Sequence, residues 1–169
     1  MSRSVLRYGA AALRDAAQPV AAVTPDIQML VDEMVAVMYA ERGVGLAAPQ
    51  IGVGLRVFVI DITGGRDPHA LRVCINPSWG ERDGMQLEEE GCLSLPGFIA
   101  TVARSARAEV HALDRDGQPC TVAGDGLLAR ALQHEMDHLE GRLFVDRLRG
   151  LSRTMILRKV RKLERAGRW

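Results

Sequence analysis

The sequence predicts an α+β fold. Strand-like stretches cluster in the middle of the chain and helical stretches lie near both ends, without a repeated strand-helix-strand rhythm. The chain has 169 residues, of which 47% are hydrophobic, so it is long enough to bury the core of one domain. No internal repeat or low-complexity linker divides it. We therefore expect a single domain over residues 1 to 169.

The first predicted element is a helix that begins near residue 24. Thr24 is a suitable capping residue, and Pro25 occupies the first helical position, where its missing N–H is tolerated. This helix leads into a glycine-containing loop at residues 43 to 45. Its apolar face recurs at helical spacing and consists of Ile27, Leu30, Val31, Met34, Val35 and Met38.

Three apolar stretches in the middle of the chain predict strands. They cover residues 55 to 62, 71 to 75 and 108 to 113. Asp114-Arg115-Asp116-Gly117 follows the third stretch and predicts a hairpin, because an Asp-Gly pair tolerates the positive φ of a tight turn. Cys74 lies in the second stretch and is expected to be a small core residue.

A second helix, predicted around residues 127 to 143, carries a metal-binding pattern. His134 and His138 are four residues apart, so both imidazoles lie on one helical face, with Glu135 beside the ion that they would bind. Two histidines are too few, because a zinc or iron site normally has at least three protein ligands. The helix follows a break at residues 124 to 126, where Asp125 offers a capping carboxylate. Its apolar face comprises Leu127, Leu128, Ala131, Leu132, Leu139 and Leu143.

Candidates for the third ligand lie on both sides of this helix. The metzincin spacing places Phe144 at the downstream ligand position, and phenylalanine cannot bind a metal. Glu164 lies further downstream among arginines, which is a poor setting for a buried ligand. Upstream, Cys92 would complete a Cys-His-His set. A lone cysteine is more often a core residue than a ligand, so the pattern by itself does not settle the choice.

At this point the chain resembles the peptide deformylases. Three of their motifs occur in the family's order and spacing, and the resemblance runs from about Val5 to Leu163. It implies mixed antiparallel strands packed around a central metal-binding helix. It also implies a hydrolase that removes the N-formyl group from the N-terminal formylmethionine of newly synthesised polypeptides, releasing formate by attack of metal-bound water. The motifs are Gly43–Gln50 (GVGLAAPQ), Glu90–Ser94 (EGCLS) and Gln133–His138 (QHEMDH).

The resemblance also implies roles for single residues. Cys92, His134 and His138 would bind the metal, which in the family is Fe²⁺, with Zn²⁺, Ni²⁺ or Co²⁺ able to replace it. Glu135 would exchange the proton, and the Gln50 side chain and the Leu93 backbone N–H would stabilise the oxyanion. The substrate would contact Gly43, Val44, Gly45, Gly91, Leu127, Arg130 and Ala131.

Two charged residues depart from the family pattern near the methionine pocket. Arg130 and Glu88 stand where the family is usually apolar. An unpaired charge there would be costly, so we predict that they form an ion pair at the pocket rim; the alternative is that both reach solvent. Ile99 replaces a common arginine, which leaves contacts to the substrate backbone in question. Glu90 and Arg104 match the family and are predicted to pair.

The chain from residue 147 to 169 predicts a basic amphipathic helix. It holds nine Lys or Arg and one acid, a net charge of +8, whereas residues 1 to 146 carry −7. The resemblance implies that this helix docks on the ribosome surface, with salt-sensitive binding to RNA phosphates. The alternative is a charged face that only aids solubility. The helix is expected to pack on the domain, arginines outward, through Leu148, Leu151, Met155, Ile156, Val160 and Leu163.

The remaining features concern location and rival functions. No apolar run reaches eighteen residues, so no membrane span is expected, and three irregularly spaced cysteines suit a reducing compartment. We expect a monomer in the bacterial cytoplasm, although the Arg- and Ser-rich start at residues 1 to 7 weakly resembles a transit peptide. The rivals are a metalloendopeptidase, which would need the absent downstream ligand, and a deformylase-like domain that binds metal or nascent chains without turnover.

Overall fold

The computed structural model describes residues 3 to 169 and confirms the α+β fold. Residues 1 and 2, which begin the Arg- and Ser-rich start, lie outside the described residues. The α-helices are α1 (Pro25–Ala40), α2 (Gly126–Leu139) and α3 (Gly150–Arg165). The strands are β1 (Gly45–Ala47), β2 (Val57–Ile60), β3 (Arg72–Asp83), β4 (Gln86–Gly91), β5 (Ile99–Arg104), β6 (Arg107–Leu113) and β7 (Pro119–Asp125). Short 3₁₀ turns lie at η1 (Ala11–Leu13), η2 (Ala48–Ile51) and η3 (Phe144–Arg147).

Helix α1 begins where its sequence predicts. The Thr24 side chain accepts a hydrogen bond from the Ile27 N–H at 3.4 Å, and Pro25 occupies the first turn. Most of the predicted apolar face is buried, and Val37 joins it. The fully buried members are Leu30, Val31, Met34, Val37 and Met38.

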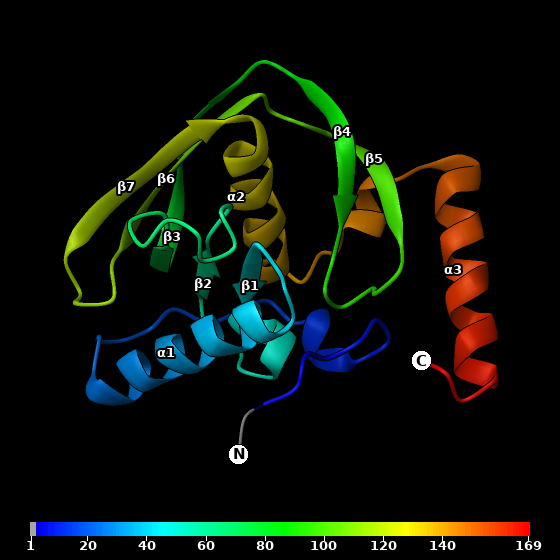
Figure 1. Cartoon of the computed structure of the whole chain (residues 1–169), viewed down its shortest axis with the longest axis horizontal. Coiled ribbons are helices and arrows are strands. Elements are labelled where there is room, and N and C mark those ends of the chain that lie inside the picture. Colours follow the sequence, from blue (N-terminus) through cyan, green and yellow to red (C-terminus); the bar gives the residue numbers. More distant parts are fainter. Residues whose placement is uncertain (1–2) are drawn as a thin grey trace.

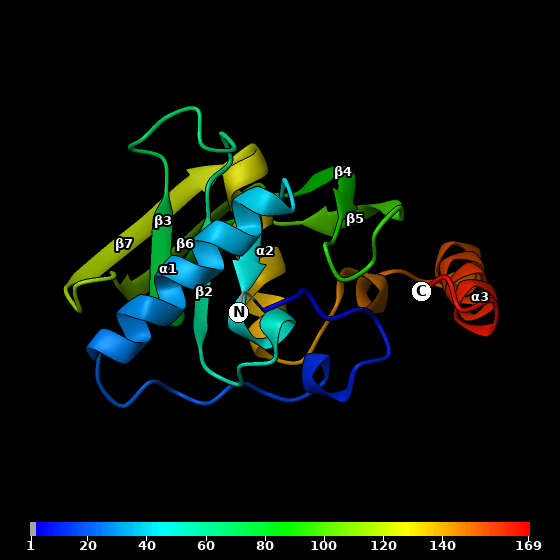
Figure 2. The same ribbon diagram turned by 60° about the horizontal axis from the view of Figure 1, so that its bottom comes forward.

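Five strands form an antiparallel sheet in the order β1-β2-β3-β6-β7. Successive side chains of a strand point to opposite faces. In β2, Val57 and Val59 therefore pack into the cluster that contains α1, while Phe58 and Ile60 pack into the cluster that contains α2. The sheet lies between these two helices, and Figure 2 shows α1 crossing β2 and β3.

Strands β4 and β5 form a separate hairpin that the sequence analysis did not predict. The hairpin lies on the other side of α2 from β6 and β7, so α2 runs between the two sheets (Figure 1). Strand β4 is rich in glutamate and mostly exposed, so it lacks the apolar alternation that reveals a strand. Its end delivers Cys92 to the side of α2.

Strand β3 runs beyond its predicted end at residue 75. Asn76 adopts a positive φ of 50°, and the pairing with β6 shifts between Ile75 and Ser78. An Asn-Pro pair usually marks the end of a strand, but here a bulge absorbs it and the strand continues to Asp83. The predicted hairpin after residue 113 is confirmed, with Gly117 at φ +80° in the turn between β6 and β7.

Two details predicted for α2 were wrong. Asp125 occupies the N-cap position, but its side chain makes no capping hydrogen bond. The helix ends at Leu139, so Leu143 lies outside it. Gly141 adopts φ +72° and its α-carbon faces the backbone carbonyl of Arg14, an approach that leaves no room for a side chain. The chain therefore turns there, and Leu143 packs into a third cluster beneath the hairpin.

Helix α3 confirms the predicted basic helix but only part of its predicted contact face. Ile156 and Val160 are buried, whereas Leu151 is 78% exposed and Met155 is 54% exposed. The helix lies at the edge of the molecule beyond β5 in both views (Figures 1 and 2), so only a narrow side of it meets the body. None of the described helices is long and apolar enough to cross a membrane.

Candidate metal centre

Cys92, His134 and His138 converge on one point. Cys92 follows β4, and the two histidines lie on consecutive turns of α2. The Cys92 Sγ lies 3.4 Å from the His138 Nε2, which lies 3.2 Å from the His134 Nε2. All three ligand atoms lie within 4.8 Å of one another. The upstream cysteine, and not a downstream residue, therefore meets the histidine pair.

These separations fit a tetrahedral ion. Bonds of about 2.05 Å to nitrogen and about 2.3 Å to sulfur place tetrahedral ligand atoms about 3.3 Å apart for two nitrogens and about 3.6 Å apart for nitrogen and sulfur. The observed distances of 3.2 and 3.4 Å agree with this arrangement. Three protein ligands leave a fourth position for a reacting group. Phe144, at the downstream ligand position, instead stacks against the His134 ring at 6.5 Å between centroids.

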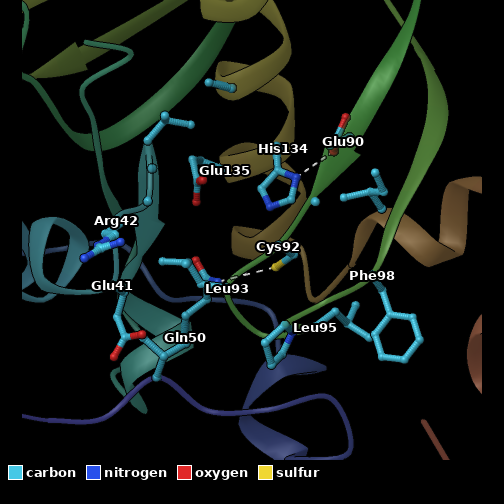
Figure 3. A pocket seen from close by; sticks show the side chains of 18 of the residues that line it. Glu41, Arg42, Gln50, Glu90, Cys92, Leu93, Leu95, Phe98, His134 and Glu135 are labelled. Carbon is cyan, nitrogen blue, oxygen red and sulfur yellow. Dashed lines mark hydrogen bonds and ion pairs between the residues drawn. The ribbon is translucent and has the colours of Figure 1, made fainter. Parts of the chain in front are cut away.

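Glu90, at the end of β4, orients His134. Its carboxylate lies 2.6 Å from the His134 Nδ1, which leaves Nε2 for the metal (Figure 3). The predicted pair with Arg104 is confirmed, since Arg104 donates to both carboxylate oxygens at 2.6 and 3.0 Å. Burial opposes ionisation, but the contacts with His134 and Arg104 outweigh it and hold the pKa of Glu90 far below its usual value.

Arg130 pairs with Glu90, so the predicted pair with Glu88 was wrong. The Arg130 Nη1 donates to Glu90 at 2.7 Å, and its Nε donates to Gln86 at 3.1 Å. Arg130 is 4% exposed, which also excludes a solvent-facing head, whereas Glu88 is exposed. Glu88 lies between Gln86 and Glu90 in β4, but its side chain is exposed to solvent, whereas the Arg130 guanidinium is buried against Glu90.

Glu135 is buried beside the ligands and has an oxygen without a partner. Its side chain is 3% exposed, and Oε2 receives no hydrogen bond from the described part of the chain. Burial raises the pKa of Glu135 to about 7, a value suited to accepting and returning a proton near neutral pH. A Cβ on residue 45 would lie 3.0 Å from the Glu135 Cδ, so glycine at this position allows β1 to approach the carboxylate.

Gln50 is buried with its amide fixed on both sides. Its Oε1 accepts from the Ala47 N–H at 2.9 Å. Its Nε2 donates to the Ser94 hydroxyl at 3.1 Å and lies 3.6 Å from the Cys92 sulfur, so the N–H end of the amide faces the ligand group (Figure 3). Gln50 is therefore placed to donate a hydrogen bond near the metal.

The predicted site residues line one cleft of about 740 Å³. His138 is the exception, because it lies behind the cleft wall with an exposure of 1%. The cleft contains Gly43, Val44, Gly45, Gln50, Gly91, Cys92, Leu93, Leu127, Arg130, Ala131, His134 and Glu135. Sequence reasoning missed its outer wall, which includes Arg7, Glu41, Arg42 and Phe98. Glu41 and Arg42 directly precede the Gly43–Gln50 motif and Phe98 follows the Glu90–Ser94 motif, so proximity in the chain was the signal that could have found them. Arg7 is brought here by tertiary contacts of its neighbours: the Leu6 N–H donates to the Gln50 carbonyl at 2.7 Å and the Tyr8 N–H to the Ser94 carbonyl at 2.8 Å.

A model of the polypeptide deformylase family matches residues 2 to 154. The chain belongs to this family. The deformylase of Acidobacterium capsulatum is 44% identical over 169 residues, which cover 100% of this chain and 99% of that protein. The deformylase of Alkalilimnicola ehrlichii is 48% identical over 166 residues, which cover 97% of this chain and 92% of that protein.

Solved deformylase structures have the same fold. The Legionella pneumophila enzyme superimposes with a TM-score of 0.92 at 46% identity, and the match covers 99% of this chain and 98% of that chain. The Synechococcus elongatus enzyme, solved in complex with actinonin, superimposes with a TM-score of 0.89 at 38% identity. The match covers 94% of this chain and 87% of that chain. The present chain is thus a hydrolase of protein biosynthesis that removes the N-formyl group from new polypeptides, the activity of EC 3.5.1.88. It uses a metal cofactor, and Cys92, His134 and His138 form a group able to hold one.

Proposed function

We propose that Glu135 is the proton-transferring residue of the deformylation reaction. The observation that carries this proposal is the unpartnered Oε2 of Glu135, buried in the cleft wall beside the ligand group. Glu135 takes a proton from the attacking water and gives it to the nitrogen of the methionine as the bond between that nitrogen and the formyl carbon breaks, which leaves formate and a free amino terminus. Cys92, His134 and His138 would hold a divalent ion, which would supply the Lewis acidity that makes water reactive near neutral pH.

Two donors on the cleft wall then serve the formyl oxygen. The Gln50 Nε2 and the Leu93 backbone N–H flank Cys92 and donate to this oxygen as negative charge develops on it. The backbones of Gly43, Val44, Gly45 and Gly91 hold the substrate chain. Leu127, Arg130 and Ala131, from the first turns of α2, surround the methionine side chain.

Formate release from formyl-Met-Ala-Ser by anaerobically purified, iron-loaded protein tests this proposal. Formate with intact peptide bonds supports it. Cleavage within the peptide would support the metalloendopeptidase alternative, and the absence of both products would support a binding domain without turnover. Actinonin, which the Synechococcus elongatus relative binds, should block the reaction.

For the metal, we propose Fe²⁺ as the working ion. The Cys-His-His donor set suits both ferrous iron and zinc, and selection between them depends on supply as well as affinity. Zn²⁺, Ni²⁺ and Co²⁺ should occupy the same ligands. Turnover per bound ion, compared among four preparations loaded with one metal each, tests the assignment: a zinc form faster than the anaerobic iron form would contradict it.

We also propose that α3 docks on the ribosome, where the substrate emerges. Its basic side chains are exposed along the helix, and the segment from residue 147 carries a net charge of +8. Arg158→Glu combined with Lys162→Glu reverses charge on one face without touching the buried Ile156 and Val160. This variant should lose co-sedimentation with ribosomes at low salt and retain tripeptide hydrolysis.

The matched control for ribosome binding changes the same charge elsewhere. Arg66→Glu combined with Arg107→Glu alters two exposed residues of the main body. Equal co-sedimentation of wild type and both variants would show that the basic face only aids solubility.

Because the substrate is a nascent chain, we further propose that the enzyme acts as a monomer in the cytoplasm, which sedimentation and cell fractionation can test.

A further inference from the structure

Trp169 forms the outer support of the substrate cleft. Its indole Nε1 donates to the Tyr8 carbonyl at 2.9 Å. The Phe98 ring meets the indole edge to face, with 5.9 Å between centroids and 62° between planes. The Arg7 guanidinium lies 5.7 Å from the indole centroid, within the range of a cation–π contact. Trp169 thus contacts three residues of the segments that border the cleft.

Two of these partners, Phe98 and Arg7, line the cleft itself. Phe98 lies on a turn beside Gly97, whose φ is +83°, and its ring is half-buried. In Figure 3 the Phe98 ring lies on the opposite side of Cys92 from Glu41 and Arg42, so it marks one end of the cleft. Within the described chain, Trp169 is the aromatic neighbour that holds this ring.

The third partner, Tyr8, links Trp169 to the ligand segment. The Tyr8 N–H donates to the Ser94 carbonyl, two residues after Cys92, while its own carbonyl accepts from Trp169. The same segment bonds the Gln50 backbone through Leu6. The backbone bonds of Leu6 and Tyr8 hold this segment against both motifs, and the indole bonds its outer side without touching the proposed oxyanion donors.

The cleft is larger than a single formylmethionine requires. Its volume of about 740 Å³ lies in the range that encloses drug-sized ligands. We propose that Trp169 is a positioning residue that holds Phe98 and Arg7 as the wall for the peptide residues following the formylmethionine. It then sets the affinity for longer formyl peptides and leaves the chemical step unchanged. This inference rests on the deformylase activity.

Substrates of increasing length separate this role from a general structural one. Trp169→Ala should raise KM for formyl-Met-Ala-Ser about two- to tenfold, the range expected for loss of one aromatic pair. The value of kcat, and the KM for formylmethionine amide, should stay within twofold of wild type. Trp169→Phe keeps an aromatic edge for Phe98 and should restore most of the affinity. Leu151→Ala, a change at an exposed position of the preceding helix, is the matched control.

A double variant tests whether the effect passes through Phe98. Phe98→Ala should raise the tripeptide KM by a similar factor, and adding Trp169→Ala should change it little further. Three results would each overturn the proposal: an unchanged KM in Trp169→Ala, an equal loss with the amide and the tripeptide, or a fall in kcat as the main effect. An enzyme without activity on any formyl substrate would instead refute the proposed function, and the wild-type assay shows this first.

Discussion

One carboxylate at Glu90 accepts hydrogen bonds from three side chains. His134, Arg104 and Arg130 all contact it at 2.6 to 2.7 Å, in a setting from which water is almost excluded. A buried charge of this kind is stable only while it is paired. The arrangement therefore couples the orientation of a metal ligand to the integrity of the core.

The substitution Glu90→Gln should weaken both the orientation of the metal ligand His134 and the pairing of the buried arginines. Metal affinity is expected to fall by about 10- to 100-fold, as for other groups that orient a ligand histidine. The metal-free protein should lose about 3 to 5 kcal/mol of unfolding free energy, because buried guanidinium groups lose their counter-ion. Competition with a chelator and urea unfolding measure the two effects. Glu88→Gln, on the exposed part of the same strand, should change neither.

Glu135→Gln should separate turnover from metal binding. The amide cannot accept the proton, so turnover should fall by at least about 10². Metal content should stay at the wild-type level, because Glu135 is not one of the three ligands. Metal analysis and activity assay of the same sample distinguish loss of proton transfer from loss of metal. If metal content fell in step with activity, the proton-transfer role would be wrong.

Asp61 ties α1 to the sheet. It follows β2, is fully buried, and accepts hydrogen bonds from the Tyr39 hydroxyl of α1 at 2.7 Å and from Thr63 at 2.7 and 2.8 Å. Burial opposes ionisation of Asp61, but the hydrogen bonds from Thr63 and Tyr39 outweigh it, so its pKa lies below its usual value. The bond to Asp61 correspondingly raises the pKa of Tyr39 to about 12.

The lowered pKa of Asp61 gives a pH-dependent stability. A depressed pKa in the folded state stabilises the fold above the unfolded-state pKa of about 3.9, and this contribution is lost as pH falls through the folded-state value. Asp61→Asn should therefore lower the unfolding free energy by about 1.5 to 3 kcal/mol at pH 7, and the difference from wild type should shrink toward pH 2. Urea titrations across this range measure it, with the exposed Asp15→Asn as control. A gap that stays constant with pH would contradict the ionic role.

Local signals determine which elements the sequence reveals. The cap at Thr24 and the histidine spacing of α2 act within one or two helical turns, so α1 and the ligand pair were predictable from neighbours in the chain. Strand β4 has no such signal, because two of its glutamates are exposed and the third, Glu90, is paired only with residues distant in the chain. The partner of Arg130 depends on which glutamate of β4 is buried against α2, and no nearby residue in the chain specifies this. The difference between Glu88 and Glu90 follows from that tertiary packing.

At the scale of the whole molecule, the three hydrophobic clusters should unfold together. The prediction of a single domain over residues 1 to 169 implies one cooperative transition. The two tryptophans report on different regions: Trp79 lies in β3, and Trp169 lies beside the cleft. In the Trp79→Phe variant, Trp169 fluorescence and far-ultraviolet circular dichroism should give coincident urea midpoints. An earlier fluorescence midpoint would show that the cleft end unfolds as a separate unit.

The bond between Trp169 and Tyr8 joins residues 161 positions apart. During synthesis, Tyr8 leaves the ribosome long before Trp169 does. The cleft wall must therefore wait for residue 169 to emerge. While Trp169 is still inside the ribosome this wall lacks its indole contact, so the enzyme should gain its affinity for longer formyl peptides only once that residue has left the exit tunnel.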